Sequence, residues 1–246
     1  MFLALDIGNS ATKLGLFDGD VWTGLERLDS DAGELSEELS SRLANADVQA
    51  AGIASVVPQL TDQAKTAVRM DFGVDPIIVS AELPLPFEMG YETPETLGAD
   101  RLAAASAAWI HFGRREGRSV IAVDAGTAVT TEVISGDGVY LGGAIAPGPD
   151  AIRRALVRDT AQLPEISWPD APEPIGSSTH AAISAGVSIM FLCGVRGLLE
   201  GSANKLKKPP FIVATGGWAE WLDRHLDAID VVEPDLVLDG IRLLAA

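Results

Sequence analysis

Short apolar runs with high β propensity alternate along the chain with segments in which leucine recurs at helical spacing. Residues 2–7 and 119–125 are typical of buried strands, and Leu35, Leu39 and Leu43 lie on one face of an expected helix. Such alternation over 246 residues predicts an α/β protein that is long enough to bury a full core. One large domain or two small ones would both fit this length.

The same pattern predicts the order of the elements. Strands are expected at 2–7, 14–17, 51–57, 76–80, 119–125, 132–135, 140–146, 211–215 and 231–232. Helices are expected at 35–43, 61–69, 99–112, 151–157, 181–199, 218–226 and from 236 onward, with Ser30 and Asp31 as N-cap candidates of the first. The proline-rich segments 84–96 and 163–175 are expected to be loops.

The first strand and the central strand end in the same way. Asp6 and Gly8 correspond to Asp124 and Gly126, each pair separated by 118 positions (124 − 6 and 126 − 8). Small hydroxyl or amide residues follow in both copies and lead into a second strand and a glycine-containing acidic turn. Duplication of one unit is the simplest account of this repeat.

An Asp-x-Gly turn has parts that suit phosphate binding. Glycine lets the backbone approach a ligand closely, and the side chains of Asn9, Ser10 and Thr127 can donate hydrogen bonds together with the backbone N–H groups. A carboxylate would repel phosphate by about 1–4 kcal/mol at a separation of about 4 Å. Asp6 and Asp124 therefore fit such a site only with a cation between acid and phosphate. The alternative is a simple hairpin-entry turn, which explains one copy better than a matched pair.

A second candidate lies where a long loop meets the helix expected from residue 99. Asp100 would stabilise the positive end of that helix, so capping alone could explain it. Capping does not explain Arg101, which lies at the unfavourable end of the helix dipole. An Asp-Arg pair at this place also fits an acid/base group beside an anion clamp.

Charge and composition exclude several classes. A net charge of −17 argues against a nucleic-acid surface or an anionic membrane as partner. Cys193 is the only cysteine, which excludes a disulfide framework and predicts a small core residue. The longest apolar stretch, 181–195, is shorter than the roughly 20 residues that span a bilayer. No secretory signal is recognised at the start, so a soluble cytoplasmic protein is expected.

Familiar nucleotide and hydrolase motifs are absent from the sequence. It contains no Gly-x-x-x-x-Gly-Lys, no Gly-x-Gly-x-x-Gly and no Gly-x-Ser-x-Gly, and His111, His180 and His225 have no metal-binding spacing. A duplicated strand-pair unit with Asp-x-Gly turns is instead typical of the acetate and sugar kinase, Hsp70 and actin superfamily. This resemblance implies a duplicated ribonuclease H-like (actin-like ATPase) fold. It would have two mixed sheets flanked by helices, a nucleotide cleft between them, and subdomains at 1–117 and 118–246.

Within that superfamily the chain resembles type III pantothenate kinases over nearly its whole length. The motifs that carry the resemblance are Asp6-Ile7-Gly8-Asn9-Ser10, Tyr91 with Gly98-Ala99-Asp100-Arg101, Asp124-Ala125-Gly126-Thr127-Ala128, Gly142-Gly143-Ala144-Ile145-Ala146-Pro147-Gly148, Thr160-Ala161-Gln162-Leu163-Pro164 and Thr215-Gly216-Gly217. No single motif would suffice, but their order and spacing together are specific.

The resemblance implies ATP-dependent phosphorylation of pantothenate to 4'-phosphopantothenate, the first step of coenzyme A biosynthesis. Asp100 would be the catalytic proton acceptor, and Asp6 and Asp124 would hold metal, with Mg²⁺ accompanying ATP and a monovalent cation, K⁺ or NH₄⁺, at Asp124. The implied nucleotide-binding residues are Asp6, Ile7, Gly8, Asn9, Ser10, Ala11, Thr12, Lys13 and Thr127. The implied pantothenate-binding residues are Tyr91, Gly98, Ala99, Asp100, Arg101 and Thr179. Family members are similar in forming homodimers, so Thr179 is expected to serve the neighbouring subunit's pocket.

Departures from the family pattern are mild, and three other functions stay open at this point. Ser10 replaces a common threonine, Ala125 replaces a bulkier residue, and the segment before Thr179 lacks the usual basic residue and asparagine. The alternatives are a sugar or acetate kinase of the same superfamily, a nucleotide-binding regulatory relative without enzymatic activity, and an actin-like filament protein. The presence of Asp6, Asp100 and Asp124 argues against a regulatory relative without activity. The short chain argues against an actin-like filament protein, which needs additional subdomains.

Overall fold

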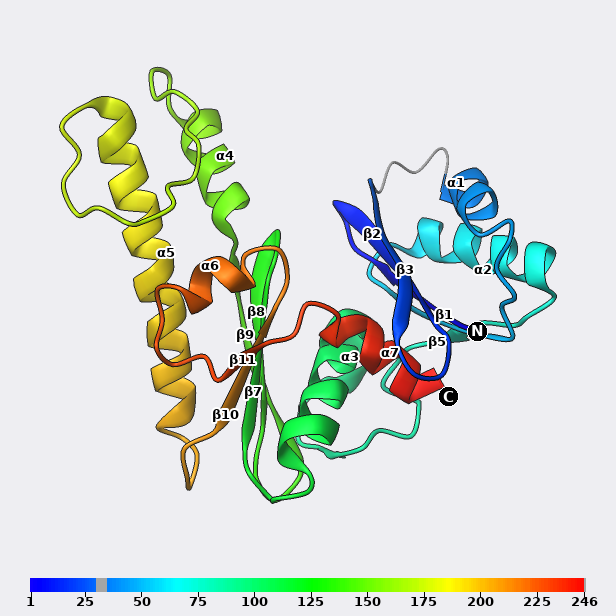
Figure 1. The fold of residues 1–246 in the computed structure, drawn as a ribbon. Helices are drawn as coiled ribbons and strands as arrows, with labels where there is room; N and C mark the ends of the chain where they lie inside the picture. The colour runs from blue at the N-terminus through cyan, green and yellow to red at the C-terminus, as the bar shows by residue number, and fades with distance from the viewer. Residues whose placement is uncertain (30–34, 246) are drawn as a thin grey trace. The chain divides into compact units, whose positions relative to one another are not determined.

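The computed structural model describes residues 1–29 and 35–245, so the N-cap candidates Ser30 and Asp31 lie outside the described residues. The chain divides into two compact units, each described separately here. Unit 1 contains residues 1–111 and returns with residues 235–245, and unit 2 contains residues 112–234 (Figure 1). The expected subdomain boundary at residue 117 stays a prediction.

Unit 1 is built on a mixed sheet in the order β3-β2-β1-β4-β5. β2 pairs antiparallel with β1 and β3, whereas β4 runs parallel to β1 and β5 parallel to β4. The strands are β1 (Phe2–Ile7), β2 (Ala11–Phe17), β3 (Trp22–Asp29), β4 (Ala50–Ser55) and β5 (Ile77–Ile78). The other elements are α1 (Leu35–Arg42), α2 (Pro58–Phe72), β6 (Glu88–Met89), the 3₁₀ turn η1 (Pro94–Thr96), α3 (Ala99–Ala108), the π-type turn η2 (Trp109–Gly113) and α7 (Leu236–Ala245).

Helices cover both faces of the unit 1 sheet. Leu3 and Leu5 of β1 share one hydrophobic cluster with Leu39 of α1 and Leu60 of α2. On the opposite face α7 packs on β1 and β4, and α3 packs on α7 (Figure 1). The alternation of side chains along a strand therefore decides which helix each residue of β1 meets.

Unit 2 repeats this plan with its strands in the order β11-β10-β7-β8-β9. β8 pairs antiparallel with β7 and β9, whereas β10 runs parallel to β7 and β11 parallel to β10. The strands are β7 (Val120–Ala125), β8 (Ala128–Ile134), β9 (Val139–Pro147), β10 (Phe211–Thr215) and β11 (Val231–Val232). The helices are α4 (Pro149–Asp159), α5 (Thr179–Ala203) and α6 (Ala219–Asp223). Val123 of β7 shares a core cluster with Phe191 and Leu199 of α5, which covers one face of the sheet (Figure 1).

The topology confirms an α/β fold with two mixed sheets and a duplicated plan. On one side of β1, and likewise of β7, two strands follow through successive antiparallel pairings, and on the other side two strands follow through parallel pairings. The turns differ by one residue: Asp6 pairs with Lys13, but Asp124 pairs with Thr130. The second copy therefore has the shorter Asp-x-Gly turn.

Several expectations were wrong. Strands β2 and β8 begin at Ala11 and Ala128, three and four residues before the expected starts, and β3 was not expected. Helix α6 is only five residues long. Cys193 is exposed on α5, not a core residue.

Helix α5 extends at both ends beyond the apolar stretch expected from the sequence and reaches 25 residues. Among the described residues it alone is long and apolar enough to cross a membrane by length and composition, with 39% of its most apolar window buried. A single such helix is weak evidence for a span, because a core helix passes the same test. Its contribution of Phe191 and Leu199 to the core of unit 2 favours a core helix.

Candidate active site

The first Asp-x-Gly turn closes tightly between β1 and β2. The N–H of Gly8 donates to the carbonyl oxygen of Ala11 at 3.0 Å, and a Cβ added to Gly8 would lie only 3.2 Å from the same oxygen. Asn9 and Ser10 are exposed at the tip of this turn, and Asp6 is half-buried at its start. The turn thus presents polar side chains around a backbone that has little room for a larger residue at position 8.

Asp6 and Lys13 lie on the α7 face of the unit 1 sheet. Ala4 is the cross-strand neighbour of Gly15, and a Cβ added to Gly15 would meet Leu238 of α7 at 3.1 Å. Two residues further along β1, Asp6 pairs with Lys13 and so has the same orientation. Burial beside α7 raises the pKa of the Asp235 carboxyl, and the positive charge of Lys13 opposes that shift. Lys13 therefore lies near the beginning of α7.

The second Asp-x-Gly turn is covered by the end of β9. The N–H of Gly126 donates to the carbonyl oxygen of Ala128 at 2.9 Å, and the N–H of Gly148 donates to that of Thr127 at 3.0 Å. A Cβ added to Gly148 would lie 2.1 Å from the Gly126 oxygen, a distance that excludes any side chain. Thr127 remains exposed above this contact.

The turn after β10 also lies against Asp124. Gly216 has φ +91°, a conformation that L side chains rarely adopt, and a Cβ there would lie 2.3 Å from the Asp124 carboxylate. The N–H of Trp218 donates to the carbonyl oxygen of Ala125 at 2.9 Å. Asp124 is therefore half-buried in a cradle of three turns, in which glycine is required at positions 148 and 216.

This cradle fits a cation and a phosphate group. Its oxygens come from a carboxylate, hydroxyls and backbone carbonyls, the ligands that Mg²⁺ and other hard cations prefer. The glycine backbone allows a phosphate to approach closely, as expected for a site that binds a triphosphate. Among the described residues no group of three or more His, Cys, Asp or Glu side chains is gathered for metal binding. The metal role of Asp6 and Asp124 thus stays a prediction.

The beginning of α3 presents Asp100 and Arg101. The N-cap residue is Gly98, which has no side chain, and the Asp100 carboxylate accepts the N–H of Arg101 at 2.8 Å. A Cβ added to Gly98 would lie 2.5 Å from the same carboxylate oxygen. Asp100 is half-buried, and the Arg101 side chain is buried with 8% exposed. Asp100 binds one amide of the first turn without being the N-cap, so capping explains only part of its placement.

Thr179 is the first residue of α5 and lies in a different unit from Asp100. The helix is capped by Ser178, whose hydroxyl accepts the N–H of Ala181 at 3.2 Å. Thr179 lines an apolar groove of about 890 Å³ between α4 and α5. Ile183 and Met190 continue that groove along α5.

The structure thus divides the predicted residues between the two units. Unit 1 holds the Asp6–Lys13 turn, Tyr91 and residues 98–101, and unit 2 holds Asp124, Thr127 and Thr179. The sequence had singled out Gly148 and Gly216 as parts of motifs, but it did not predict that both lie on the Asp124 turn. The only sequence signal was glycine at the end of each strand.

The family model for type III pantothenate kinase matches residues 2–201 of the chain. The chain belongs to the type III pantothenate kinase family. It is 36% identical over 258 residues to a type III pantothenate kinase of Roseiflexus sp. (strain RS-1), covering 99% of this chain and 98% of that protein. It is 37% identical over 253 residues to a type III pantothenate kinase of Anaeromyxobacter sp. (strain K), covering 99% and 98%. The predicted family and enzyme class are confirmed.

Solved structures confirm the fold. A protein from Campylobacter jejuni assigned to the Baf family of transcriptional activators has a TM-score of 0.66 at 22% identity, over 98% of this chain and 96% of that chain. A ROK-family glucokinase from Streptomyces griseus, solved with glucose and AMPPNP, has a TM-score of 0.58 at 16% identity, over 99% and 98%. At these identities the likeness shows the fold alone, so neither a regulatory role nor sugar phosphorylation follows.

Proposed function

We propose that this chain transfers the γ-phosphoryl group of ATP to the primary hydroxyl of pantothenate, the first step of coenzyme A biosynthesis. Membership of the family supports the substrates, and the cradle around Asp124 is the structural observation that carries the proposal. The hydroxyl oxygen forms a bond to the γ-phosphorus, the bond to the β-γ bridging oxygen breaks, and ADP leaves. Such a transfer needs positioning and charge neutralisation more than covalent help from the protein.

The two Asp-x-Gly turns are the proposed nucleotide site. Asp6–Lys13 in unit 1 and Thr127 in unit 2 would bind the phosphates through backbone N–H groups, hydroxyls and the Lys13 ammonium group. Asp6 would hold Mg²⁺ with the nucleotide, and Asp124 a monovalent cation such as K⁺ or NH₄⁺. Bound there, these cations would neutralise the charge that builds up on the transferred phosphoryl group.

Asp100 is the proposed proton acceptor for the attacking hydroxyl. The Arg101 N–H holds one oxygen of the Asp100 carboxylate, and the absence of a side chain at Gly98 leaves room for that oxygen. Gly98, Ala99, Arg101 and Tyr91 would line the pantothenate pocket, where Arg101 offers a cation for the substrate carboxylate. A positioned general base of this kind contributes roughly 100- to 10,000-fold to the rate.

A homodimer would complete the pocket, with Thr179 donated to the neighbouring subunit. The apolar groove beside Thr179 supports this, because Met190 is 58% exposed in it although the residue is large and apolar. A second copy of the chain is the occupant that would cover such a surface. A cytoplasmic location fits a family of metabolic enzymes and an α5 that contributes to the core of unit 2.

The decisive assay supplies ATP and Mg²⁺ with pantothenate present or omitted, and with K⁺ exchanged for Na⁺. Phosphopantothenate should form only with pantothenate present, and faster with K⁺. A panel of sugars and acetate should be inactive as acceptors. Phosphorylation of a sugar in place of pantothenate would contradict the proposal.

Replacing Asp100 by asparagine tests its role. Asp100→Asn keeps the size of the side chain and an oxygen that can accept the Arg101 N–H, but it cannot take up the proton. We expect kcat to fall at least roughly 100-fold, while calorimetry finds ATP and pantothenate affinities close to those of the wild type. Turnover near the wild-type rate would refute the assigned role.

A further inference from the structure

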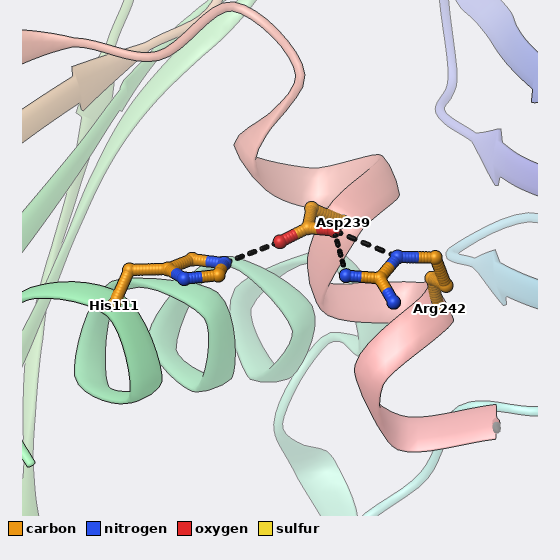
Figure 2. A network of polar contacts seen from close by, with 3 residues as sticks. All are labelled: His111, Asp239 and Arg242. Carbon is orange, nitrogen blue, oxygen red and sulfur yellow. Dashed lines mark hydrogen bonds and ion pairs between the residues drawn. The ribbon is translucent and has the colours of Figure 1, made fainter. Parts of the chain in front are cut away.

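Three side chains of unit 1 form a polar network that the proposed chemistry does not use. The Asp239 carboxylate on α7 pairs with Nε2 of His111 in η2, and its other oxygen accepts Nε and Nη2 of Arg242 at 2.9 and 2.6 Å (Figure 2). The Arg242 guanidinium also lies 4.4 Å from the ring centroid of Phe17 on β2. With side-chain exposures of 17% and 22% for Asp239 and Arg242, the ion pair is partly shielded from water. The network joins three elements that are distant in sequence.

Helix α3, which carries Asp100 in its first turn, packs on α7 through very small residues. A Cβ added to Gly240 of α7 would lie 1.9 Å from the carbonyl oxygen of Ala103, so the two backbones touch directly. Six of the ten residues of α3 are alanine. Small residues permit a close approach, but they interlock little, because they have no long side chains to fit between those of the neighbouring helix. Directional polar contacts can add to this backbone contact in fixing how far α3 slides or rotates on α7.

His111 is placed to supply such a contact at the far end of α3. The helix continues without a break into η2, which has the wider π-type winding often found at functional sites. Asp239, which pairs with His111, and Gly240, whose backbone contacts Ala103, are adjacent in the sequence. Both contacts therefore hold α3 and η2 through the same turn of α7.

Helix α7 also packs against β2, the strand that follows the first Asp-x-Gly turn. Leu238 lies against Gly15 of β2, and Asp235 lies close enough to Lys13 for its pKa to respond to that charge. Helix α7 therefore touches both the strand that carries Lys13 and the helix that carries Asp100. A shift of α7 would move one relative to the other.

We propose that His111, Asp239 and Arg242 are positioning residues, which hold α3 on α7 so that Asp100 keeps a fixed place relative to the Asp6–Lys13 turn. This rests on the proposed role of Asp100. None of the three side chains is placed against substrate. Their effect on the rate is indirect, through geometry, and a misplacement of about 1 Å can cost about 100-fold in rate.

Because the charge of His111 depends on pH, a positioning role of this residue should make the rate depend on pH. A residue that only stabilised the fold would not have this effect on the rate. Histidine changes charge between pH 5 and 8, and a charged donor makes a stronger hydrogen bond to a carboxylate. The charged groups near the His111–Asp239 pair are Arg242 of α7 and Asp235, which immediately precedes α7 and is itself influenced by Lys13 of β2. We expect the network to hold α3 more firmly at pH 6 than at pH 8.

Two substitutions at His111 separate positioning from stability. His111→Asn keeps a neutral donor, whereas His111→Lys keeps a positive charge at every pH in the range. Asp75→Asn is the matched control, because it breaks an exposed ion pair with Arg69 in the same unit. We measure kcat, both KM values and melting temperature at pH 6 and pH 8, and hydrogen exchange of residues 99–108.

The asparagine variant should lose at least about fivefold in kcat at pH 6 and less at pH 8, with KM for ATP within about twofold of the wild type. The lysine variant should recover most of the activity at both pH values, and Asp75→Asn should behave as the wild type. Exchange in α3 should rise in the asparagine variant alone.

An unchanged kcat in His111→Asn, or the same loss at both pH values without rescue by lysine, would overturn the inference. Failure of the proposed function is recognised separately. If the wild type does not phosphorylate pantothenate, or Asp100→Asn stays active, the proposed function fails. The hydrogen-exchange result still tests whether the network immobilises α3.

Discussion

Gly216 and Gly217 are neighbours in the sequence but have different surroundings. Gly216 has φ +91° and lies against the Asp124 carboxylate, whereas a Cβ on Gly217 would meet nothing within 4 Å. Gly216→Ala should therefore strain the backbone by about 1–3 kcal/mol and push the turn away from Asp124. We expect ATP affinity, measured by calorimetry, to fall at least roughly tenfold, which corresponds to about 1.4 kcal/mol.

Gly217→Ala is the matched control and should bind ATP as the wild type does. Equal affinities in both variants would mean that the contact with Asp124 does not shape the nucleotide site. This pair tests the cradle independently of the identity of the acceptor substrate.

At the residue scale, the sequence predicted which residues are candidates for the site better than it predicted what those residues contact. Asp124 and Gly126 could be found because they repeat Asp6 and Gly8, and a repeat is visible in a single sequence. The pairing of His111 with Asp239 spans 128 positions and involves no motif, so only the fold could reveal it. Cys193 was misplaced because a cysteine within an apolar helix has the same sequence signal whether it faces the core or the surface.

At the element scale, the ionised carboxylate of Asp239 helps to hold α7 in place and so contributes to the stability of the fold. Burial, the largest single influence, raises the pKa of the Asp239 carboxyl, but the hydrogen bonds and the charges of His111 and Arg242 together outweigh it, so the net shift is downward. A carboxyl whose pKa is lower in the folded protein than in the unfolded chain stabilises the folded state at pH values above its ordinary pKa of about 3.9. This stabilisation is lost as the pH falls through the pKa that the group has in the folded protein.

Asp239→Asn should consequently reduce the melting temperature at pH 5–8 by at least roughly 2–4 °C, the change that 1 kcal/mol produces in a chain of this size. The difference from the wild type should shrink as the pH falls below about 4, where the unfolded wild-type chain takes up a proton at this carboxyl, and it should disappear once the folded form is protonated as well. Asp137→Asn is the control, because Asp137 pairs with Lys207 on an exposed turn and should change little. A constant difference down to pH 2 would contradict an electrostatic origin.

The elements themselves were mostly predictable, and the failures have physical causes. Helix α2 could be found from its apolar spacing, and it ends where Gly73 adopts φ +67° and donates to the Arg69 carbonyl. Strand β3 was missed because Gly24 interrupts an edge strand whose side chains are largely exposed, which gives no clear alternation. Helix α6 was overestimated because Trp218 and Leu226 contribute to the core without being helical.

At the scale of the whole molecule, the sequence indicated the duplication but not how the chain ends. The last helix could be recognised as apolar, yet nothing local indicated that it belongs with residues 1–111. It does so because Gly52 and Gly240 leave room for it against β4 and α3. Assignment to a unit depends on such small residues at contacts between distant segments, which a strand or helix pattern does not encode.

The groove between α4 and α5 allows the proposed homodimer to be tested by charge. Met190 lines the groove, and Met70 is an equally large methionine on α2, 80% exposed and outside it. Burying a glutamate in an apolar interface costs several kcal/mol, so Met190→Glu should dissociate a dimer that Met70→Glu leaves intact. In sedimentation equilibrium the Met190→Glu variant should show the monomer mass of 25.7 kDa, and the wild type twice that value.

Because Thr179 is proposed to complete the neighbouring pocket, kcat/KM for pantothenate should fall with dissociation while ATP binding persists. A wild type that sediments as a monomer and is fully active would show that the groove has another role.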